Sequence, residues 1–231
     1  MNILAVETSG FEGSIAIKCD GNAVDERFLS AEGRRHAQTL VMEVKRLLLD
    51  HHLSPSAIDA VAVSVGPGSF TGLRVGVVFA KTFAWANGCD LIAVDTLQAL
   101  AQQIEESPKH VGVISDAQRQ EVFMNTYHWD SDKQMRRSDV ETSILPVAEL
   151  AESSELGAEI ITGPGLEKFG PQLEGMHSLA DGSFWQPRAA TVAEIGSKLV
   201  ADGVTANIET LEPVYIRRSY AEEKATGSKT A

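Results

Sequence analysis

The glycine-rich segment Gly66–Gly72, with the sequence GPGSFTG, has residue types that suit contact with a phosphate or another anion. It joins an apolar run to a helical pattern, so free backbone amides and the helix dipole point at one place. It is not a P-loop, because no Gly-Lys pair follows, and Thr71 replaces the last glycine of a dinucleotide fingerprint. We expect Gly66, Gly68 and Ser69 either to contact a nucleotide or anion or to serve tight backbone packing, with Ser69 capping the helix.

Two carboxylates, Glu7 and Asp116, follow apolar runs at corresponding places in the two halves of the chain. A metal–phosphate site uses such groups at the ends of strands, although Glu7 is also placed to bond to the neighbouring turn. Other chemistry lacks its motifs, because the six histidines form no HxxxH or HExxH pair and no GxSxG serine is present. The residues therefore predict no catalytic constellation and no metal site.

Hydrophobic periodicity predicts the elements that position these residues in the first half. Alternating and apolar runs predict three strands, at Asn2–Glu7, Ser14–Lys18 and Ala23–Leu29. A tight turn is expected between the second and third strands, at Asp20-Gly21-Asn22. Helices are expected next at Gly33–His52, Thr71–Asn87 and Thr96–Glu106, with buried strands between them at Ala60–Val65 and Asp90–Val94.

The second half repeats this order with losses, which predicts a second lobe after Ser107-Pro108. Strands are expected at Val111–Ser115, Glu121–Trp129, Met135–Leu145 and Glu159–Thr162. Helices are expected at Pro146–Glu155, from the turn Gly163-Pro164-Gly165 to Leu173, and at Ala189–Asp202. The turn Gly163-Pro164-Gly165 echoes Gly66-Pro67-Gly68. We therefore predict an α/β protein of two related lobes, 1–106 and 107–221, with the last helix packing back on the first lobe and a flexible tail at 222–231.

Composition limits the classes of function. The chain has 231 residues, a net charge of −12 and 43% apolar residues, which is typical of a globular protein. An acidic chain lacks the cations for phosphate contacts, so independent nucleic-acid binding is not expected. No apolar run is long enough for a membrane span, the N-terminus does not resemble a signal peptide, and two cysteines predict no disulfide framework. We expect a cytoplasmic protein.

Small residues form a stripe along the helix after the glycine turn, at Gly72, Gly76, Ala80 and Ala84. Glycine inside an exposed helix costs about 1 kcal/mol relative to alanine, so such a stripe implies that another backbone comes close. The helix is apolar most of the way round, which predicts burial on two sides. We expect one side to meet the chain's own sheet and the other to meet a second helix, either of this chain or of another. If that helix belongs to a partner, Gly76→Leu abolishes partner binding without unfolding the lobe.

Several segments resemble the bacterial TsaB (YeaZ) family of tRNA threonylcarbamoyladenosine biosynthesis proteins. The most specific is VGPGSFTGLRVGVVFAKTFA at Val65–Ala84. Supporting segments lie at Ile3–Ser9, Gly33–Leu40, Asp116–Phe123 and Glu212–Arg218. The resemblance implies the duplicated fold of the actin/hexokinase/Hsp70-like ATPase (ribonuclease H-like) superfamily.

The resemblance also implies a function. Family members support formation of threonylcarbamoyladenosine next to the anticodon in tRNAs that read A-starting codons. The transferase of that system is a paralogue, TsaD, which binds a metal through a histidine pair, whereas the matching place here, Val94–Ala101, has no histidine. This difference implies a non-catalytic scaffold or activator that forms a heterodimer with a TsaD-type transferase. It also implies that a TsaE-type ATPase joins the pair.

The family pairs through helices of its first lobe, so the resemblance together with the helix stripe predicts a set of interface residues. These are His36, Leu40, Val44, Thr71, Gly72, Arg74, Val75, Gly76, Phe79, Ala80 and Phe83. The resemblance implies a homodimer of the chain when it is alone, contact with tRNA only through the complex, and ATP with Mg²⁺ used by the complex rather than bound by this chain. The alternative is an ATP-dependent phosphotransferase or ATPase of the same superfamily, which would use Glu7, Asp116 and the glycine turns.

Overall fold

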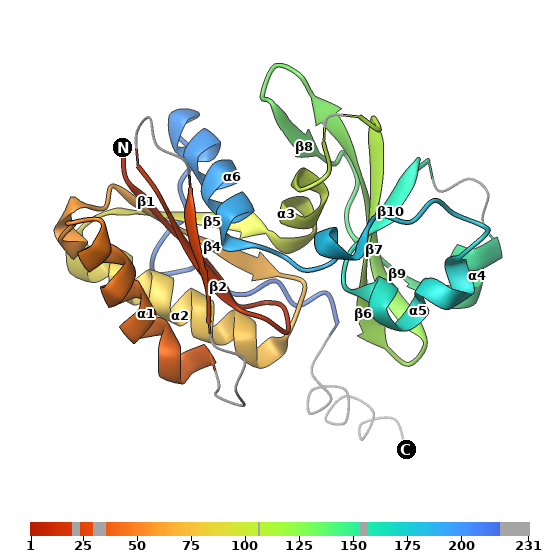
Figure 1. Cartoon of the computed structure of the whole chain (residues 1–231), viewed down its shortest axis with the longest axis horizontal. Coiled ribbons are helices and arrows are strands. Elements are labelled where there is room, and N and C mark those ends of the chain that lie inside the picture. The colour runs from red at the N-terminus through yellow and green to blue at the C-terminus, as the bar shows by residue number, and fades with distance from the viewer. Residues whose placement is uncertain (20–23, 30–35, 106, 153–156, 218–231) are drawn as a thin grey trace.

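The computed structural model describes residues 1–19, 24–29, 36–105, 107–152 and 157–217. Two five-stranded sheets lie side by side, each covered by helices (Figure 1). The expected turn at Asp20-Gly21-Asn22 and the expected tail at 222–231 lie outside the described residues. Among the described residues, no helix has the length and apolar character required to cross a membrane.

The first sheet has the strand order β3-β2-β1-β4-β5. Its members are β1 (Ile3–Glu7), β2 (Ser14–Lys18), β3 (Asp25–Phe28), β4 (Ala60–Gly66) and β5 (Asp90–Asp95). The first three strands form an antiparallel meander, and β4 and β5 join β1 in parallel. All seven residues of β4 are buried, as its continuous apolar run predicts for a central parallel strand.

Alternation of side chains along the strands supplies this sheet with two apolar faces. On one face, Leu4 and Val6 pack with helices α1 (His36–Asp50) and α2 (Phe70–Asn87). On the other face, Ile3 and Ala5 pack with α6 (Ala189–Ala201). Figure 1 shows α1 and α2 below the sheet and α6 above it. The last described helix therefore covers the first sheet.

The second sheet has the order β10-β6-β7-β8, and β9 also pairs with β7. Its members are β6 (His110–Gln118), β7 (Glu121–Asp130), β8 (Met135–Arg137), β9 (Ser143–Pro146) and β10 (Ile160–Thr162). Helices α4 (Val147–Glu152) and α5 (Gly165–Leu173) pack with one side of this sheet, and α3 (Thr96–Gln102) packs with Val111 and Val113 of β6.

One expected strand, Met135–Leu145, is wrong as a single element. It is two short strands that pair with different parts of β7, because Met135 lies opposite Asp130 whereas Leu145 lies opposite Val122. The segment between them folds over β7, where the Asn125 side-chain amide donates to Val140 O and Thr142 Oγ1. Apolar periodicity did not reveal this break because each piece is only three or four residues long and neither alternates clearly.

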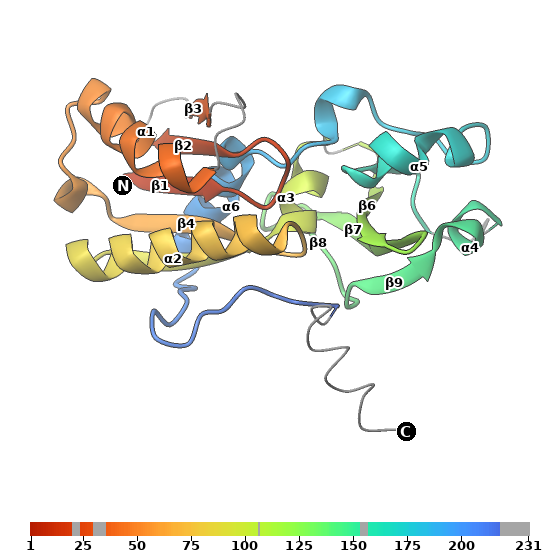
Figure 2. The same cartoon turned by 90° about the horizontal axis from the view of Figure 1, so that it is seen from below.

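The two sheets repeat one local arrangement, in which a strand, a Gly-Pro-Gly turn and a helix follow one another as β4–α2 and β10–α5. Each turn passes close to the backbone of a neighbouring segment. A Cβ on Gly68 would lie 2.8 Å from Ser9 O beyond β1, and a Cβ on Gly163 would lie 2.3 Å from Ile114 O in β6. Beyond α6, the described chain ends in an irregular segment, drawn in dark blue in Figure 2, that runs below α2 towards the second sheet.

Candidate functional site

An apolar groove runs between α1 and α2 on the outer side of the first sheet. It has a volume of about 490 Å³ and is lined by Leu40, Val41, Arg74, Val75, Val78, Phe79 and Thr82. Large apolar side chains stand exposed on these two helices, with Val41 and Val78 each 63% and Trp85 76% exposed. An exposed apolar groove of this kind is typical of a protein–protein contact.

The predicted interface residues divide according to their place around this groove. Arg74, Val75 and Phe79 line it, and Phe83 continues the line, with its ring 5.8 Å from that of Phe79. Thr71 is exposed at the start of α2. Leu40 and Val44 are buried in the core of the first lobe, although Leu40 also forms part of the groove floor. His36 begins α1, and its side chain lies outside the described part of the chain.

The small-residue stripe of α2 faces the chain's own sheet, so its prediction as a partner contact is wrong for Gly72, Gly76 and Ala80. All three are buried. A Cβ on Gly72 would lie 1.9 Å from Thr8 O, and one on Gly76 would lie 2.4 Å from Thr8 Oγ1. The close backbone approach that the stripe implied is therefore an internal one. Gly76→Leu would perturb the fold rather than leave it intact.

Sequence reasoning missed the groove residues Val41 and Val78, and the exposed Trp85 further along α2. A signal for them was present, because Val78 and Trp85 lie on the side of α2 opposite to the glycines, seven residues apart. Once the glycines are assigned to the sheet, an apolar residue on the opposite side must be exposed.

The glycine turn packs closely against other parts of the same chain. Gly66 has φ of +123°, and a Cβ there would lie 2.7 Å from Val214 O. Ser69 caps α2, since its Oγ accepts a hydrogen bond from Gly72 N at 3.3 Å, as predicted. The tight-packing alternative thus has direct support for Gly66 and Gly68, while an anion contact at these residues stays a prediction.

A cleft between the lobes lies beside this turn, with a volume of about 900 Å³. The β1–β2 loop, the glycine turn, the β6 end and the last described segment line it, including Ser9, Phe11, Ser69, Asp116, Gln118 and Arg217. The Asp116 carboxylate forms an ion pair with Lys168, with 2.9 Å between Oδ2 and Nζ. Glu7 is fully buried and accepts hydrogen bonds from Ser9 and Ser64. The two carboxylates at equivalent strand ends are therefore engaged with protein groups.

The Glu7 carboxyl has a raised pKa because burial penalises its charged form. Hydrogen bonds from Ser64 and Ser9 act in the opposite direction but are the smaller influence. A fully enclosed acid of this kind is a structural group, because it has no exposed oxygen to offer to a metal or phosphate.

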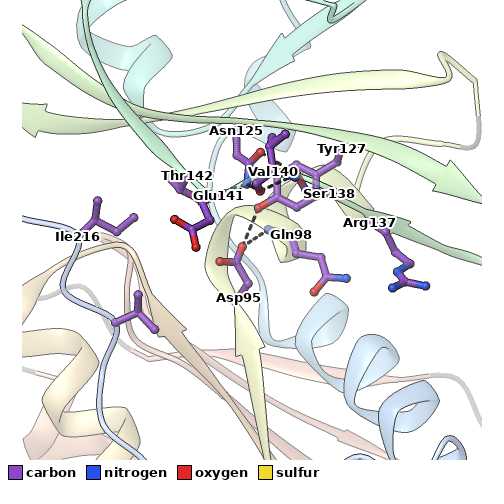
Figure 3. A pocket seen from close by; sticks show the side chains of 11 residues that line it. Asp95, Gln98, Asn125, Tyr127, Arg137, Ser138, Val140, Glu141, Thr142 and Ile216 are labelled. Carbon is purple, nitrogen blue, oxygen red and sulfur yellow. Dashed lines mark hydrogen bonds between the residues drawn. The ribbon is translucent and has the colours of Figure 1, made fainter.

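A second cavity, of about 560 Å³, lies between α3 and β7 (Figure 3). Tyr127 Oη donates to Asp95 Oδ1 at 2.8 Å, and the same oxygen accepts from Gln98 N at 2.6 Å. Burial raises the pKa of both Asp95 and Tyr127. Sequence reasoning missed this contact, because Asp95 and Tyr127 come from different lobes and no spacing relates them.

The comparisons with known proteins agree over almost the whole chain. Residues 30–210 match the family model of TsaD, tRNA N6-adenosine threonylcarbamoyltransferase. The tRNA threonylcarbamoyladenosine biosynthesis protein TsaB of Escherichia coli is 31% identical, over 99% of this chain and 100% of the relative. TsaB of Bacillus subtilis is 27% identical, over 97% of each chain.

A solved structure from Pseudomonas aeruginosa, described as an uncharacterized protein with similarity to peptidase YEAZ, matches with a TM-score of 0.81 and 26% identity. It covers 94% of this chain and 99% of that chain. The two-sheet architecture and the TsaD match define a member of the threonylcarbamoyltransferase-like branch of the actin/hexokinase/Hsp70-like fold. Within that branch, the full-length likeness shows that the chain belongs to the TsaB (YeaZ) family. The predicted family and fold class are thereby confirmed.

Proposed function

We propose that this chain is the non-catalytic subunit that supports threonylcarbamoylation of the adenosine next to the anticodon, by docking on a TsaD-type transferase. The names of its relatives place them in tRNA threonylcarbamoyladenosine biosynthesis. A TsaE-type ATPase joins the pair, and the complex uses ATP and Mg²⁺. The chain contacts tRNA only as part of this complex, which acts in the cytoplasm. Alone, the chain forms a homodimer through the same surface.

The observation that carries this proposal is the exposed apolar face of α1 and α2. Val41 and Val78 stand exposed at a groove that the buried Leu40 also lines, and Trp85 is exposed further along α2. Covering such a face removes apolar area from water at about 25 cal/mol per Å². Two facing helices on each partner are enough for an interface of standard size, about 1,600 Å² in total.

The docking face is tested by Val78→Asp. A carboxylate at the centre of the groove must be desolvated on docking, so we expect at least a tenfold loss of affinity for the TsaD-type transferase of the same organism. The measurement is calorimetry or co-purification of the two chains. The matched control is Val204→Asp, at a valine that is 50% exposed beyond α6 and away from the groove.

Equal binding of the Val78→Asp and Val204→Asp variants would contradict docking through α1 and α2. The activity itself is tested by mixing the chain with the TsaD-type and TsaE-type proteins, tRNA and the threonylcarbamoyl donor, and measuring modified adenosine. We expect modification to require this chain and to fall in the Val78→Asp variant.

The alternative of an independent ATPase is separated by calorimetry of the isolated chain with Mg-ATP. The engagement of Asp116 with Lys168 and the burial of Glu7 favour the non-catalytic function. Micromolar binding with turnover would favour the enzyme instead.

A further inference from the structure

The last described segment, residues 207–217, follows the last described helix, α6, and connects the two lobes. We call it the clasp. It has no regular secondary structure beyond a turn at its start. Hydrogen bonds and apolar contacts nevertheless fix it to both lobes along its length. We propose that the clasp couples the α1–α2 groove to the cleft between the lobes, with Arg74 as the residue that joins the two.

The first part of the clasp is fixed to α2. Lys81 Nζ donates to the backbone oxygens of Glu209 and Leu211, at 3.2 and 2.9 Å. The Ile208 and Leu211 side chains pack against the core of the first lobe. This part of the clasp is thus an extension of the first lobe.

The middle of the clasp crosses the end of β4. Val214 N donates to Val65 O at 2.7 Å, which adds a backbone bond beyond the sheet. The Val214 carbonyl then lies against Gly66, where any Cβ would be 2.7 Å from its oxygen. Gly66 therefore permits the crossing.

The end of the clasp is fixed to the second lobe. Ile216 packs in the core that contains Val111 and Phe123, and Arg217 donates to Ala117 O and to the Glu121 carboxylate. The side chains of Val214 and Ile216 line both the cleft and the second cavity. The clasp is accordingly the wall that separates the two.

Arg74 connects this wall with the groove. Its Nε donates to Tyr215 Oη at 3.0 Å, and its guanidinium lies 3.9 Å from the centre of the Phe70 ring, which stacks on Tyr215 at 4.8 Å. Arg74 also lines the groove. A group that draws the guanidinium into the groove must break its bond to Tyr215. Release of Tyr215 loosens the segment that carries Arg217.

The test is hydrogen exchange of the isolated full-length chain by NMR, so it does not depend on the proposed docking. Arg74→Ala should speed exchange of the Val214 amide, and of the β6–β7 turn at residues 117–121, by about two- to tenfold, the range expected for loss of one such hydrogen bond. Thr82→Ala is the control, because Thr82 lines the groove and its hydroxyl bonds to Val78 O within α2. It should leave both regions unchanged.

Coupling is reciprocal, so Arg217→Ala should also speed exchange at Val214, and the double variant should exceed neither single variant by much. Arg74 is exposed, so its loss should leave the fold and the melting temperature almost unchanged. If Arg74→Ala speeds exchange at Val214 alone, or at neither region, the proposed coupling is overturned.

Discussion

At the scale of single residues, contacts decide what each conspicuous side chain does. Gly72 and Gly76 let α2 lie directly on the end of β1, where Thr8 Oγ1 donates to Gly72 O at 2.8 Å. Glu7, the residue before Thr8, accepts hydrogen bonds from the hydroxyl groups of Ser9 and Ser64. Residue types that suggested phosphate chemistry or a partner contact thus hold the first lobe together.

Gly72→Ala tests this packing. Alanine is favoured over glycine in a helix by about 1 kcal/mol, but here its Cβ would meet a backbone oxygen that cannot move away. We expect a net loss of about 2 kcal/mol in the free energy of unfolding, measured by urea denaturation. The matched control is Gly182→Ala, where a Cβ meets nothing within 4 Å. An unchanged stability of Gly72→Ala would contradict the close packing of α2 on β1.

Glu7→Gln tests the enclosed carboxyl. Its folded pKa is raised above the ordinary value of 4.5, so its proton stabilises the fold fully below about pH 4.5. This contribution is lost as the pH rises through the folded pKa. The stability of the natural chain relative to Glu7→Gln should therefore be greatest in acid and decline with rising pH, as measured by melting temperature from pH 4 to 8.

The control for this pH series is Glu174→Gln, at an exposed glutamate. We expect the difference between that variant and the natural chain to be nearly independent of pH over the same range. A flat difference for Glu7→Gln as well would mean that the Glu7 carboxyl is not held in its protonated form.

At the scale of elements, α2 carries two surfaces with different tasks. Its buried side packs on β1 and β4 through small residues, and its outer side forms the groove with α1. Its start is fixed by the Ser69 cap and by the bond from Ser69 N to Ser9 O at 2.8 Å. Both surfaces are positioned by the same glycine turn.

Ser69→Ala tests the start of α2. Removal of a serine cap costs about 1 kcal/mol, which corresponds to a melting temperature lower by about 2–4 °C for a chain of this size. Ser69→Asp, which keeps an oxygen for the Gly72 amide, should restore most of the loss. If both variants melt alike, the cap contributes nothing to the stability of α2.

At the scale of the whole molecule, two elements from the end of the described chain tie distant parts together. Helix α6 covers the face of the first sheet opposite α1 and α2, and the clasp joins that lobe to β6 and β7. The cleft and the second cavity are therefore both lined by one irregular segment. In the proposed coupling, a partner that docks on the outer groove acts on the cleft through this shared segment.

Local pattern was enough to predict much of the fold. The boundaries of β2, the buried run of β4 and the strand–glycine–helix order of β4–α2 follow from alternation, apolar length and turn chemistry, and the structure confirms them. The break between β8 and β9 could not be predicted, because it depends on pairing with β7 across the sheet. The family, too, could be inferred from the segment around Gly66–Gly72 before any contact was known.

The sequence by itself determined most of the elements, the two related lobes and the need for a close backbone approach along α2. Only the tertiary structure decided which backbone that is. Periodicity groups residues onto sides of a helix, but α2 is apolar on most of them, so the pattern does not say which side meets the sheet. The sheet excludes every Cβ at Gly72 and Gly76 and leaves Val78 and Trp85 exposed. For the same reason, the clasp over Gly66 depends on contacts about 150 residues apart in the chain, which no local pattern encodes.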